Sequence, residues 1–198
     1  GEILGDISGT GALAVNGTPA GIALLGNNTY TGPTTVAGGI LDIDGSLSPA
    51  SNVTINNGGI LAGMGGVPGV ITINSGGGIA PGASGNGTLT VSNLALASGT
   101  AANFTGADSG NYARLAVTGA LAYGGNLTLT LDNSLKAGTY DLFSAGSRSG
   151  DFDGVALAGL FTGSLSDSGG MWSGTTTSAN FSLNLASGQL TVSVNFSP

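Results

Sequence analysis

Two short acidic segments have the residue spacing of a metal-binding loop. The segments LDIDG and GDFDG each place two aspartates one residue apart and follow the second with glycine. This pattern is a fragment of a calcium loop, because hard cations take carboxylate oxygens as ligands. A complete EF-hand loop also needs a later bidentate glutamate, which neither segment supplies. We expect these aspartates to form turns and to keep the chain soluble; calcium binding at Asp42/Asp44 or at Asp151/Asp153 is the alternative.

A serine in a glycine-rich segment has the surroundings of a catalytic nucleophile. Residues 166–170 read SDSGG, one residue away from the G-D-S-G-G pattern around the nucleophile of chymotrypsin-like proteases. Ser168 would need a general base to take its proton, but the chain has no histidine, and Lys136 is its only lysine. We therefore expect a Ser/Gly turn at this position.

The remaining charged residues do not form the pattern of a hydrolase groove. Glycosidases and lyases need clustered carboxylates, often with a cation, whereas the acids here occur singly or as the D-x-D pairs. Positive charge comes only from Arg114, Lys136 and Arg148. The sequence predicts no catalytic residue, no metal site and no cofactor, and we expect the chain to be non-enzymatic.

The composition indicates an all-β chain with an unusual surface. Of 198 residues, 39 are glycine, 40% are hydrophobic and only 7% are charged. Glycine disfavours helices, and the abundant threonine and valine favour strands. A net charge of -7 repels phosphate backbones, which excludes nucleic acid as a partner class, and the absence of cysteine excludes disulfides and thiolate metal sites.

Three segments repeat one pattern and place a threonine at a fixed interval. NVTINNGGILAG, VITINSGGGIAPG and TLTVSNLALASGT carry Thr54, Thr72 and Thr90, each 18 residues after the last, and Thr35 precedes Thr54 by 19. A repeat of 18–20 residues fits one coil of a parallel β-solenoid, in which three short strands are joined by tight turns. The sequence therefore predicts stacked coils.

Alternation within each repeat assigns side chains to the interior or to solvent. In VTI, ITI and LTV, the outer two residues can face the core while threonine faces out. We expect an outward ladder of Thr54, Thr72 and Thr90. The inward stacks would be Val53/Ile71/Leu89 and Ile55/Ile73/Val91.

Glycine and asparagine mark the expected corners of the coils. NNGG, NSGGG and GNG follow the strands, and glycine takes positive φ freely while asparagine tolerates it. Asparagine side chains can also stack in ladders from coil to coil.

The pattern changes after about Tyr112. RLAVTGALAYGGNLTLTL gives longer alternating strands, and FSLNLASGQLTVSV predicts an antiparallel hairpin that turns at residues 186–189. Aromatic residues also concentrate in this part of the chain: Tyr140, Phe143, Phe152, Phe161, Trp172, Phe181 and Phe196. Because a solenoid exposes an apolar cross-section at its end, we expect parallel β-helix coils in residues 1–111 and final coils with a C-terminal cap in residues 112–198.

At residues 26–41 the sequence matches a family pattern. GNNTYTGPTTVAGGIL resembles the autotransporter-associated β-strand repeat, roughly G-x-N-T-Y-T-G-x-T-T-V-x-x-G-x-L. GGILAGMGGV and GGGIAPGASGNGTLTVSNLAL are similar to the segments that follow it in that family, and AGTYDLFSA is similar to the region near the end of the passenger. The recognisable motifs cover about residues 26–145.

The resemblance implies a right-handed parallel β-helix exported by type V secretion, as in pertactin-like passengers. Such passengers are mostly adhesins at the bacterial surface, and their C-terminal coils can act as a folding core, or autochaperone. The implied partner is the protein's own outer-membrane translocator barrel, which we do not expect within these 198 residues.

Two roles remain open for this chain. The first is a β-helical stalk and a C-terminal core that promotes the folding and secretion of a surface adhesin. The second is an adhesive module in its own right, which binds a host surface or glycan or associates with itself.

Within the family motif, the residues divide between the interior, the ladder and the corners. The interior candidates are Tyr30, Val36 and either Ile40 or Leu41. We expect Thr34 and Thr35 near the ladder, and Gly32, Gly38 and Gly39 at corners.

Overall fold

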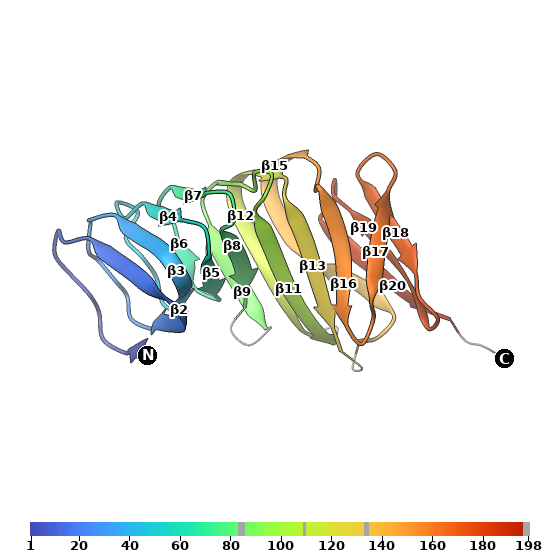
Figure 1. Ribbon diagram of the computed structural model, residues 1–198, viewed down its shortest axis with the longest axis horizontal. Coiled ribbons are helices and arrows are strands. Elements are labelled where there is room, and N and C mark those ends of the chain that lie inside the picture. The colour runs from blue at the N-terminus through green and yellow to red at the C-terminus, as the bar shows by residue number, and fades with distance from the viewer. Residues whose placement is uncertain (83–85, 109, 133–134, 196–198) are drawn as a thin grey trace.

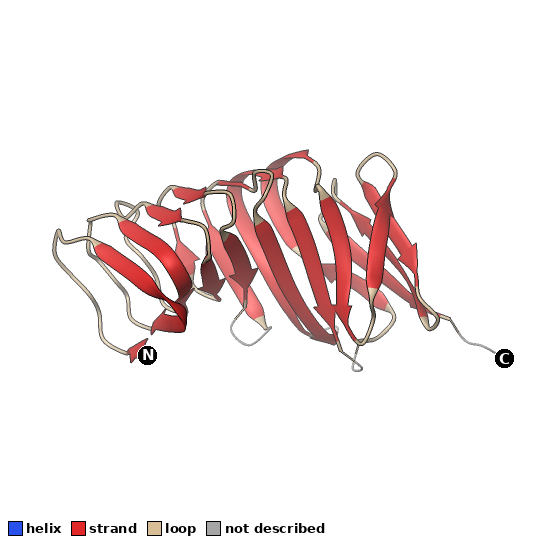
Figure 2. Cartoon of the chain, viewed as in Figure 1, coloured by secondary structure: helices blue, strands red, loops and turns tan. Residues whose placement is uncertain are grey.

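The protein is an elongated β-solenoid, with its N-terminus at one end of the long axis and its C-terminal strands, drawn in red, at the other (Figure 1). The computed structural model describes residues 1–82, 86–108, 110–132 and 135–195. Across these residues every regular element is a strand and none is a helix (Figure 2). The chain makes about 6 solenoid turns and ends in antiparallel strands, which confirms the fold class expected from the sequence. The described part of the chain contains no helix able to span a membrane.

One face of the solenoid is a continuous parallel stack. Its strands are β2 (Leu13–Leu24), β3 (Thr34–Ile43), β5 (Gly59–Gly63), β8 (Gly78–Pro81), β11 (Ala101–Asp108), β13 (Asn126–Leu131) and β16 (Gly154–Gly159). The short β1 (Glu2–Ile3) pairs with the end of β2. On β5 and β13 every second side chain enters the interior, as the alternation of buried and more exposed residues shows.

Two further stacks of strands form the other faces. The strands β4 (Val53–Ile55) and β7 (Ile71–Ile73) stack on the first part of β3. A further stack contains β6 (Gly66–Val67), β9 (Gly87–Val91), β12 (Asn111–Tyr123) and β15 (Phe143–Gly150), and β10 (Leu94–Ala95) pairs with the end of β12. All these pairs are parallel, so each coil rests on the one before it.

The threonine ladder is shorter than predicted. Thr35, Thr54 and Thr72 pair in register and face outward, but Thr90 pairs with Gly66 and Ala116 instead of with Thr72. The expected register of the third repeat is therefore wrong. An outward threonine between two apolar residues suits any face of a solenoid, so the local pattern does not define which face a strand occupies.

The same shift moves two of the expected interior residues to another stack. Val53 lies on Ile71 as predicted, whereas Leu89 pairs with Leu115, and Val91 pairs with Val67 and Val117. Leu89 and Val91 are still buried, so their inward direction is confirmed and only their neighbours differ.

The coils lengthen toward the C-terminus. On the continuous face, register partners are 20 residues apart from Leu41 to Leu61 and 18 apart from Leu61 to Ile79. The interval rises to 23 at Ala102, 25 at Leu127 and 28 at Val155. The predicted coil of 18–20 residues thus describes only the first half of the solenoid.

Glycine and asparagine occupy the corners as predicted. Gly58 and Gly76 have φ near 80°, and their N–H groups continue the backbone pairing from coil to coil at the corner. Next to them, the Asn74 amide donates to Asn56 Oδ1 over 2.8 Å, so the two side chains form the expected asparagine ladder.

The family motif contributes a buried polar cluster, and one residue predicted near the threonine ladder belongs to it. Tyr30, Val36 and Leu41 are buried as predicted, whereas Ile40 is 36% exposed. Thr34 is also fully buried and does not lie beside Thr35 on the ladder. Its hydroxyl lies 2.6 Å from the Tyr30 hydroxyl and 2.9 Å from that of Ser51. Because strand residues alternate in direction, only one of two adjacent threonines can face solvent.

The C-terminal end is covered by an antiparallel cap. Its strands are β14 (Gly138–Asp141), β17 (Gly163–Asp167), β18 (Met171–Thr175), β19 (Ala179–Asn184) and β20 (Gln189–Val194). They pair in the order β16, β17, β18, β19, β20, β14, so the cap sheet begins on the last solenoid strand. The predicted hairpin is β19 and β20. Phe196, one of the aromatic residues predicted to concentrate in the C-terminal part of the chain, lies outside the described residues.

Candidate functional site at the junction of the coils and the cap

In the first acidic pair, Asp42 lies on β3 and Asp44 follows the end of that strand. Asp44 Oδ1 accepts a hydrogen bond from the N–H of Met64 over 3.2 Å. Asp42 Oδ1 is shielded from solvent and accepts no hydrogen bond from any residue that the structure describes. Burial raises the pKa of Asp42, and the neighbouring charge of Asp44 raises it further. Within the described ranges, no three or more His, Cys, Asp or Glu side chains come together as a metal site would require.

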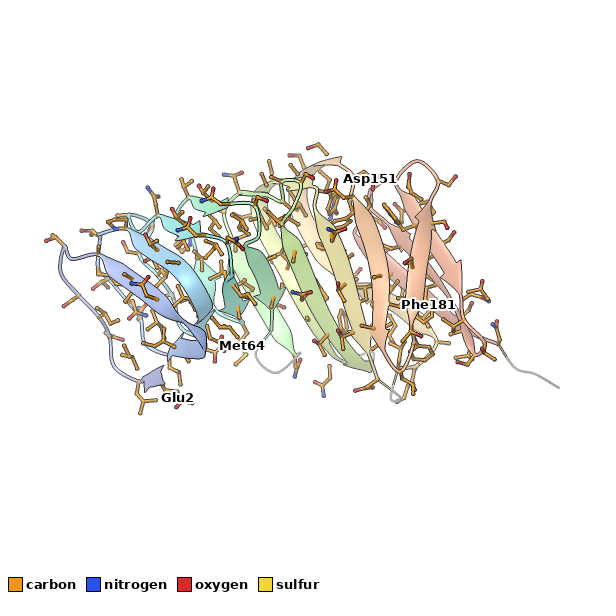
Figure 3. The ribbon with its side chains drawn as sticks, in the orientation of Figure 1. Glu2, Met64, Asp151 and Phe181 are labelled. Carbon is orange, nitrogen blue, oxygen red and sulfur yellow. The ribbon has the colours of Figure 1, made fainter. Side chains whose placement is uncertain are left out.

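In the second acidic pair, Asp151 forms a hydrogen bond to the cap. Asp151 Oδ1 accepts hydrogen bonds from Trp172 Nε1 over 2.7 Å and from the N–H of Phe152 over 2.8 Å. Asp151 lies at the end of the last coils (Figure 3), so this contact attaches β18 to the solenoid. Asp153 is exposed.

Ser168 lies in the turn between β17 and β18. Its N–H donates to the carbonyl oxygen of Met171 over 2.9 Å. The carboxylate of Asp167 accepts the N–H groups of Gly169 and Gly170 over 3.2 and 2.9 Å. These bonds form a hairpin turn, as expected for a Ser/Gly segment, and they engage the aspartate that precedes the serine.

The turn between β19 and β20 contacts the last coils through several hydrogen bonds. These bonds join residues that are far apart in the sequence. The N–H groups of Leu142 and Phe143 both donate to the carbonyl oxygen of Gly188 over 3.0 Å. Gly188 has φ 76°, and a Cβ at this position would lie 2.1 Å from the carbonyl oxygen of Phe143. Only glycine fits both the backbone conformation and this close approach.

Two polar side chains from the solenoid reach the same turn. The buried Tyr123 hydroxyl donates to the carbonyl oxygen of Leu185 over 3.1 Å. Arg148 Nη2 donates to the carbonyl oxygen of Phe143 over 3.1 Å, and Nη1 donates to that of Ala186 over 3.4 Å. Burial raises the pKa of Tyr123, and the guanidinium of Arg148 partly offsets this increase. The turn is therefore held by backbone and side-chain bonds together.

Aromatic rings fill the interior beside these bonds. The ring centroids of Phe104 and Phe143 are 4.8 Å apart, and Tyr123 lies 5.4 Å from Phe143 and 5.2 Å from Phe152. Such pairs contribute about 0.5–1.5 kcal/mol each beyond their buried area. The predicted concentration of aromatic residues near the C-terminus thus corresponds to a packed layer between the coils and the cap.

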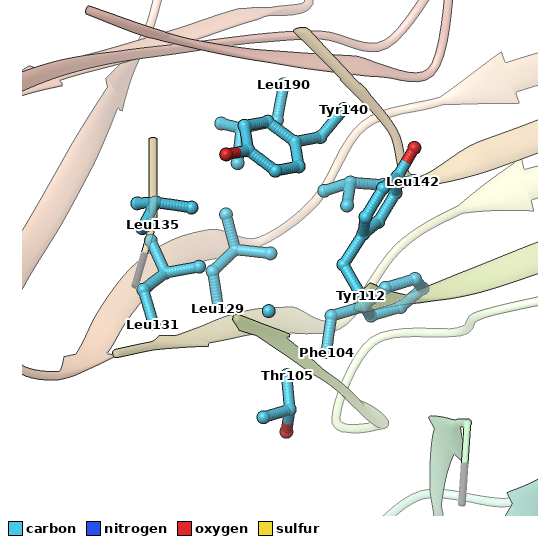
Figure 4. Close-up of a pocket in the computed structure, with 10 residues that line it drawn as sticks. Phe104, Thr105, Tyr112, Leu129, Leu131, Leu135, Tyr140, Leu142 and Leu190 are labelled. Atoms are coloured by element: carbon cyan, nitrogen blue, oxygen red, sulfur yellow. The ribbon is translucent and has the colours of Figure 1, made fainter. Parts of the chain in front are cut away.

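The remaining space in this layer is small. A cavity of about 10 Å³ lies among side chains of the coils and the cap, including Tyr112, Leu129, Tyr140 and Leu190 (Figure 4). The rings of Tyr112 and Tyr140 meet edge to face at 5.1 Å. This volume is close to the minimum that holds one water molecule, so the junction is a packing interface and not a substrate pocket.

Parts of three known proteins are similar in sequence to this chain. No family model matches the sequence. Two extracellular serine proteases of Serratia marcescens are 44% identical over 130 residues and 39% identical over 134 residues, which is 65% and 66% of this chain and 12% of each protease. The adhesin BmaC autotransporter of Brucella suis biovar 1 (strain 1330) is 46% identical over 80 residues, 40% of this chain and 2% of that adhesin.

The chain resembles an autotransporter passenger segment. The resemblance found in the sequence motifs is therefore confirmed, and the relatives indicate export across the outer membrane to the cell surface or the extracellular space. This passenger-like chain spans only 12% of the length of the serine proteases and 2% of that of the adhesin.

Proposed function

We propose that the chain is a non-enzymatic stalk of a surface adhesin whose C-terminal part promotes folding and secretion. In this proposal residues 1–111 supply coils, and residues 112–198 supply the final coils and an autochaperone-like cap. The observation that carries the proposal is the set of bonds from Tyr123, Phe143 and Arg148 to the turn at residues 185–188. These bonds join the cap to the solenoid across a long sequence separation.

The cap gives the solenoid a defined end from which to fold. Each coil buries its apolar cross-section only when a neighbour covers it, so an isolated coil is unstable. The antiparallel cap and the aromatic layer cover the final cross-section without needing a further coil. A chain that emerges with its C-terminal part first would then add each coil to a folded template, and this gain would favour export without a nucleotide.

The implied partner is the outer-membrane translocator barrel of the complete protein. A passenger that crosses a membrane unfolded must avoid premature crosslinks and strong charge, and the chain has no cysteine and 7% charged residues. The composition supports this threading route.

Removal of residues 112–198 tests the folding role. The matched pair is the full chain and the 1–111 fragment, each fused to the same translocator barrel and compared by surface exposure and by cooperative urea unfolding after purification. We expect the full chain to reach the surface and unfold cooperatively, while the fragment does neither. Normal secretion and cooperative unfolding of the fragment would contradict the proposal.

A second candidate function is adhesion by the solenoid itself. The outward ladder of Thr35, Thr54 and Thr72 is uncharged, so two such faces repel each other little and can exchange hydrogen bonds. Sedimentation velocity at increasing protein concentration separates the two functions: self-association predicts a rising sedimentation coefficient, whereas a simple stalk stays monomeric.

A further inference from the structure

An apolar patch covers the outer side of three neighbouring strands in the first coils. Leu24 on β2, Leu41 on β3 and Leu61 on β5 are fully buried, so the residues beside them point away from the core. The register aligns these outward residues in three rows across the strands: Gly21/Ile40/Ile60, Ala23/Asp42/Ala62 and Leu25/Asp44/Met64. The third row lies just past the strand ends. These residues form the outer patch, and all of them except the two aspartates are apolar or glycine.

The outer patch leaves large apolar side chains in contact with solvent. Leu25 is 40% exposed, Ile40 is 36% exposed and Met64 is 50% exposed. Later strands of the same stack carry polar residues at their outward positions: Asn103, Thr105, Asn126, Thr128 and Thr130. The apolar character is therefore a property of the first coils and not of the whole face. A contiguous apolar surface of this kind marks an interaction site.

Two carboxylates lie on the middle strand of the outer patch. Asp42 is flanked on the neighbouring strands by Ala23 and Ala62, so apolar groups surround its charge. Burial and the charge of Asp44 both raise the pKa of Asp42, and no cation of the described residues offsets this increase. A positive group placed over the middle strand would therefore relieve an unfavourable arrangement of charge.

The chain itself is a poor source of that positive group. Its net charge is -7, and both arginines are engaged elsewhere. Arg114 lies 4.2 Å from the centroid of the Tyr112 ring, and Arg148 donates to carbonyl oxygens beside the cap turn. A second copy of the chain, or an anionic lipid surface, would bring further negative charge onto the two aspartates, so both are disfavoured as occupants.

Charge complementarity selects a different occupant. A lysine or arginine flanked by apolar side chains would pair its cation with the aspartates and cover Leu25, Ile40 and Met64. We propose that the outer patch binds a cationic amphipathic segment of another protein. At strand spacing the patch is about 10 Å wide and about 14 Å long, which accommodates roughly five extended residues. Such a small contact predicts weak, reversible binding.

Isothermal titration of the full chain with the peptide KLAKLAKKLAKLAK tests the proposal, and its acidic counterpart ELAELAEELAELAE is the probe of opposite charge. We expect only the cationic peptide to bind. Asp42→Asn keeps the side-chain shape and removes the charge, so it should weaken binding about tenfold. Ile40→Ser should weaken it about three- to tenfold by removing apolar contact. The matched controls are Asp153→Asn and Leu160→Ser, which change an exposed acid and an exposed leucine outside the outer patch and should leave the affinity unchanged.

Several outcomes would overturn the assignment. These are no binding of the cationic peptide at millimolar concentration, equal binding of the acidic peptide, and unchanged affinity in Ile40→Ser. Equal losses in Asp42→Asn and Asp153→Asn would show a general attraction to the negative chain instead of docking at the patch. Dimerisation, or binding to phosphatidylglycerol vesicles, that Ile40→Ser abolishes would assign the patch to a second copy or to a membrane.

Circular dichroism of each variant separates lost binding from lost fold. The proposal does not depend on the folding role of the cap, so cap-dependent secretion can fail without affecting any of these titrations.

Discussion

The Tyr123 hydroxyl donates a hydrogen bond to the carbonyl oxygen of Leu185, 62 residues further along the chain. Tyr123 belongs to the solenoid strand β12, and Leu185 begins the turn of the cap hairpin. The bond is buried, so water cannot replace it when it breaks. It therefore links the stability of the cap to that of the coils.

Replacing Tyr123 with phenylalanine tests this link. The substitution keeps the ring and leaves the Leu185 carbonyl without the hydroxyl, so we expect a loss of about 1–3 kcal/mol in the free energy of unfolding. Urea unfolding measures this loss. The control is Ser187→Ala in the same turn, where the side chain is exposed and we expect less than about 0.5 kcal/mol. Equal effects of the two substitutions would contradict a specific role for Tyr123.

Gly188→Ala tests the close approach of the turn to Phe143. Both the positive φ and the clash with the Phe143 carbonyl oxygen oppose a side chain, so we expect destabilisation of more than about 2 kcal/mol. Gly169 is the matched control, because its φ of 67° is similar but a Cβ there would meet no atom within 4 Å. Gly169→Ala should cost about 1 kcal/mol. Thermal unfolding of both variants checks the difference, and similar melting temperatures would argue against the clash.

The same substitution at the two adjacent threonines of the family motif should have very different effects on stability. Thr34→Val removes the hydroxyl between those of Tyr30 and Ser51 in a fully buried site, and we expect a loss of about 1–3 kcal/mol. Thr35→Val changes an outward position of the ladder, where valine has similar strand propensity, and should change stability by less than about 0.5 kcal/mol. Denaturant unfolding of the two variants measures this difference. A larger loss of unfolding free energy in Thr35→Val than in Thr34→Val would contradict the prediction.

Asp42→Asn should stabilise the protein at neutral pH. The pKa of Asp42 is raised in the folded state, so the folded protein binds more protons than the unfolded chain between the ordinary and the raised pKa, and stability falls as pH rises through that window. Because Asp42 is partly exposed and solvent screens its charge, we expect a gain of no more than about 1 kcal/mol. Melting temperatures from pH 3 to pH 7 check the trend. The advantage of the variant should shrink as the pH falls, and a constant advantage would assign it to another cause.

The features predicted correctly from the sequence depend on local chemistry. Alternation around Thr54 and Thr72 defines which side chains enter the core, and positive φ restricts the corners to residues such as Gly58 and Gly76. The hairpin of β19 and β20 was predictable for the same reason, since its turn ends at Gly188.

The features that the sequence did not predict depend on contacts between distant residues. The face occupied by Thr90 depends on the length of the preceding loop, and the LTV pattern contains no information about that length. From the sequence, Arg148 is only one of three positively charged residues. Its parallel register partner Leu121 is buried, so Arg148 also points inward, and its contact with the cap turn depends on this register, which the local sequence does not define. The departure of the cap sheet from the solenoid depends on where β17 exchanges β16 for β18, which strand patterns alone do not define.

The lengthening of the coils gives the molecule a graded response to mechanical tension. A force that peels coils from the N-terminal end breaks the backbone pairing one coil at a time, because parallel neighbours are joined mainly to the coil above and below. At about 3.4 Å per extended residue, a coil of 18 residues between Leu61 and Ile79 releases about 60 Å of chain, and one of 28 residues between Leu127 and Val155 releases about 95 Å. From the coil that begins at Leu61, successive extension steps should therefore grow longer toward the cap, so that each later step releases more chain.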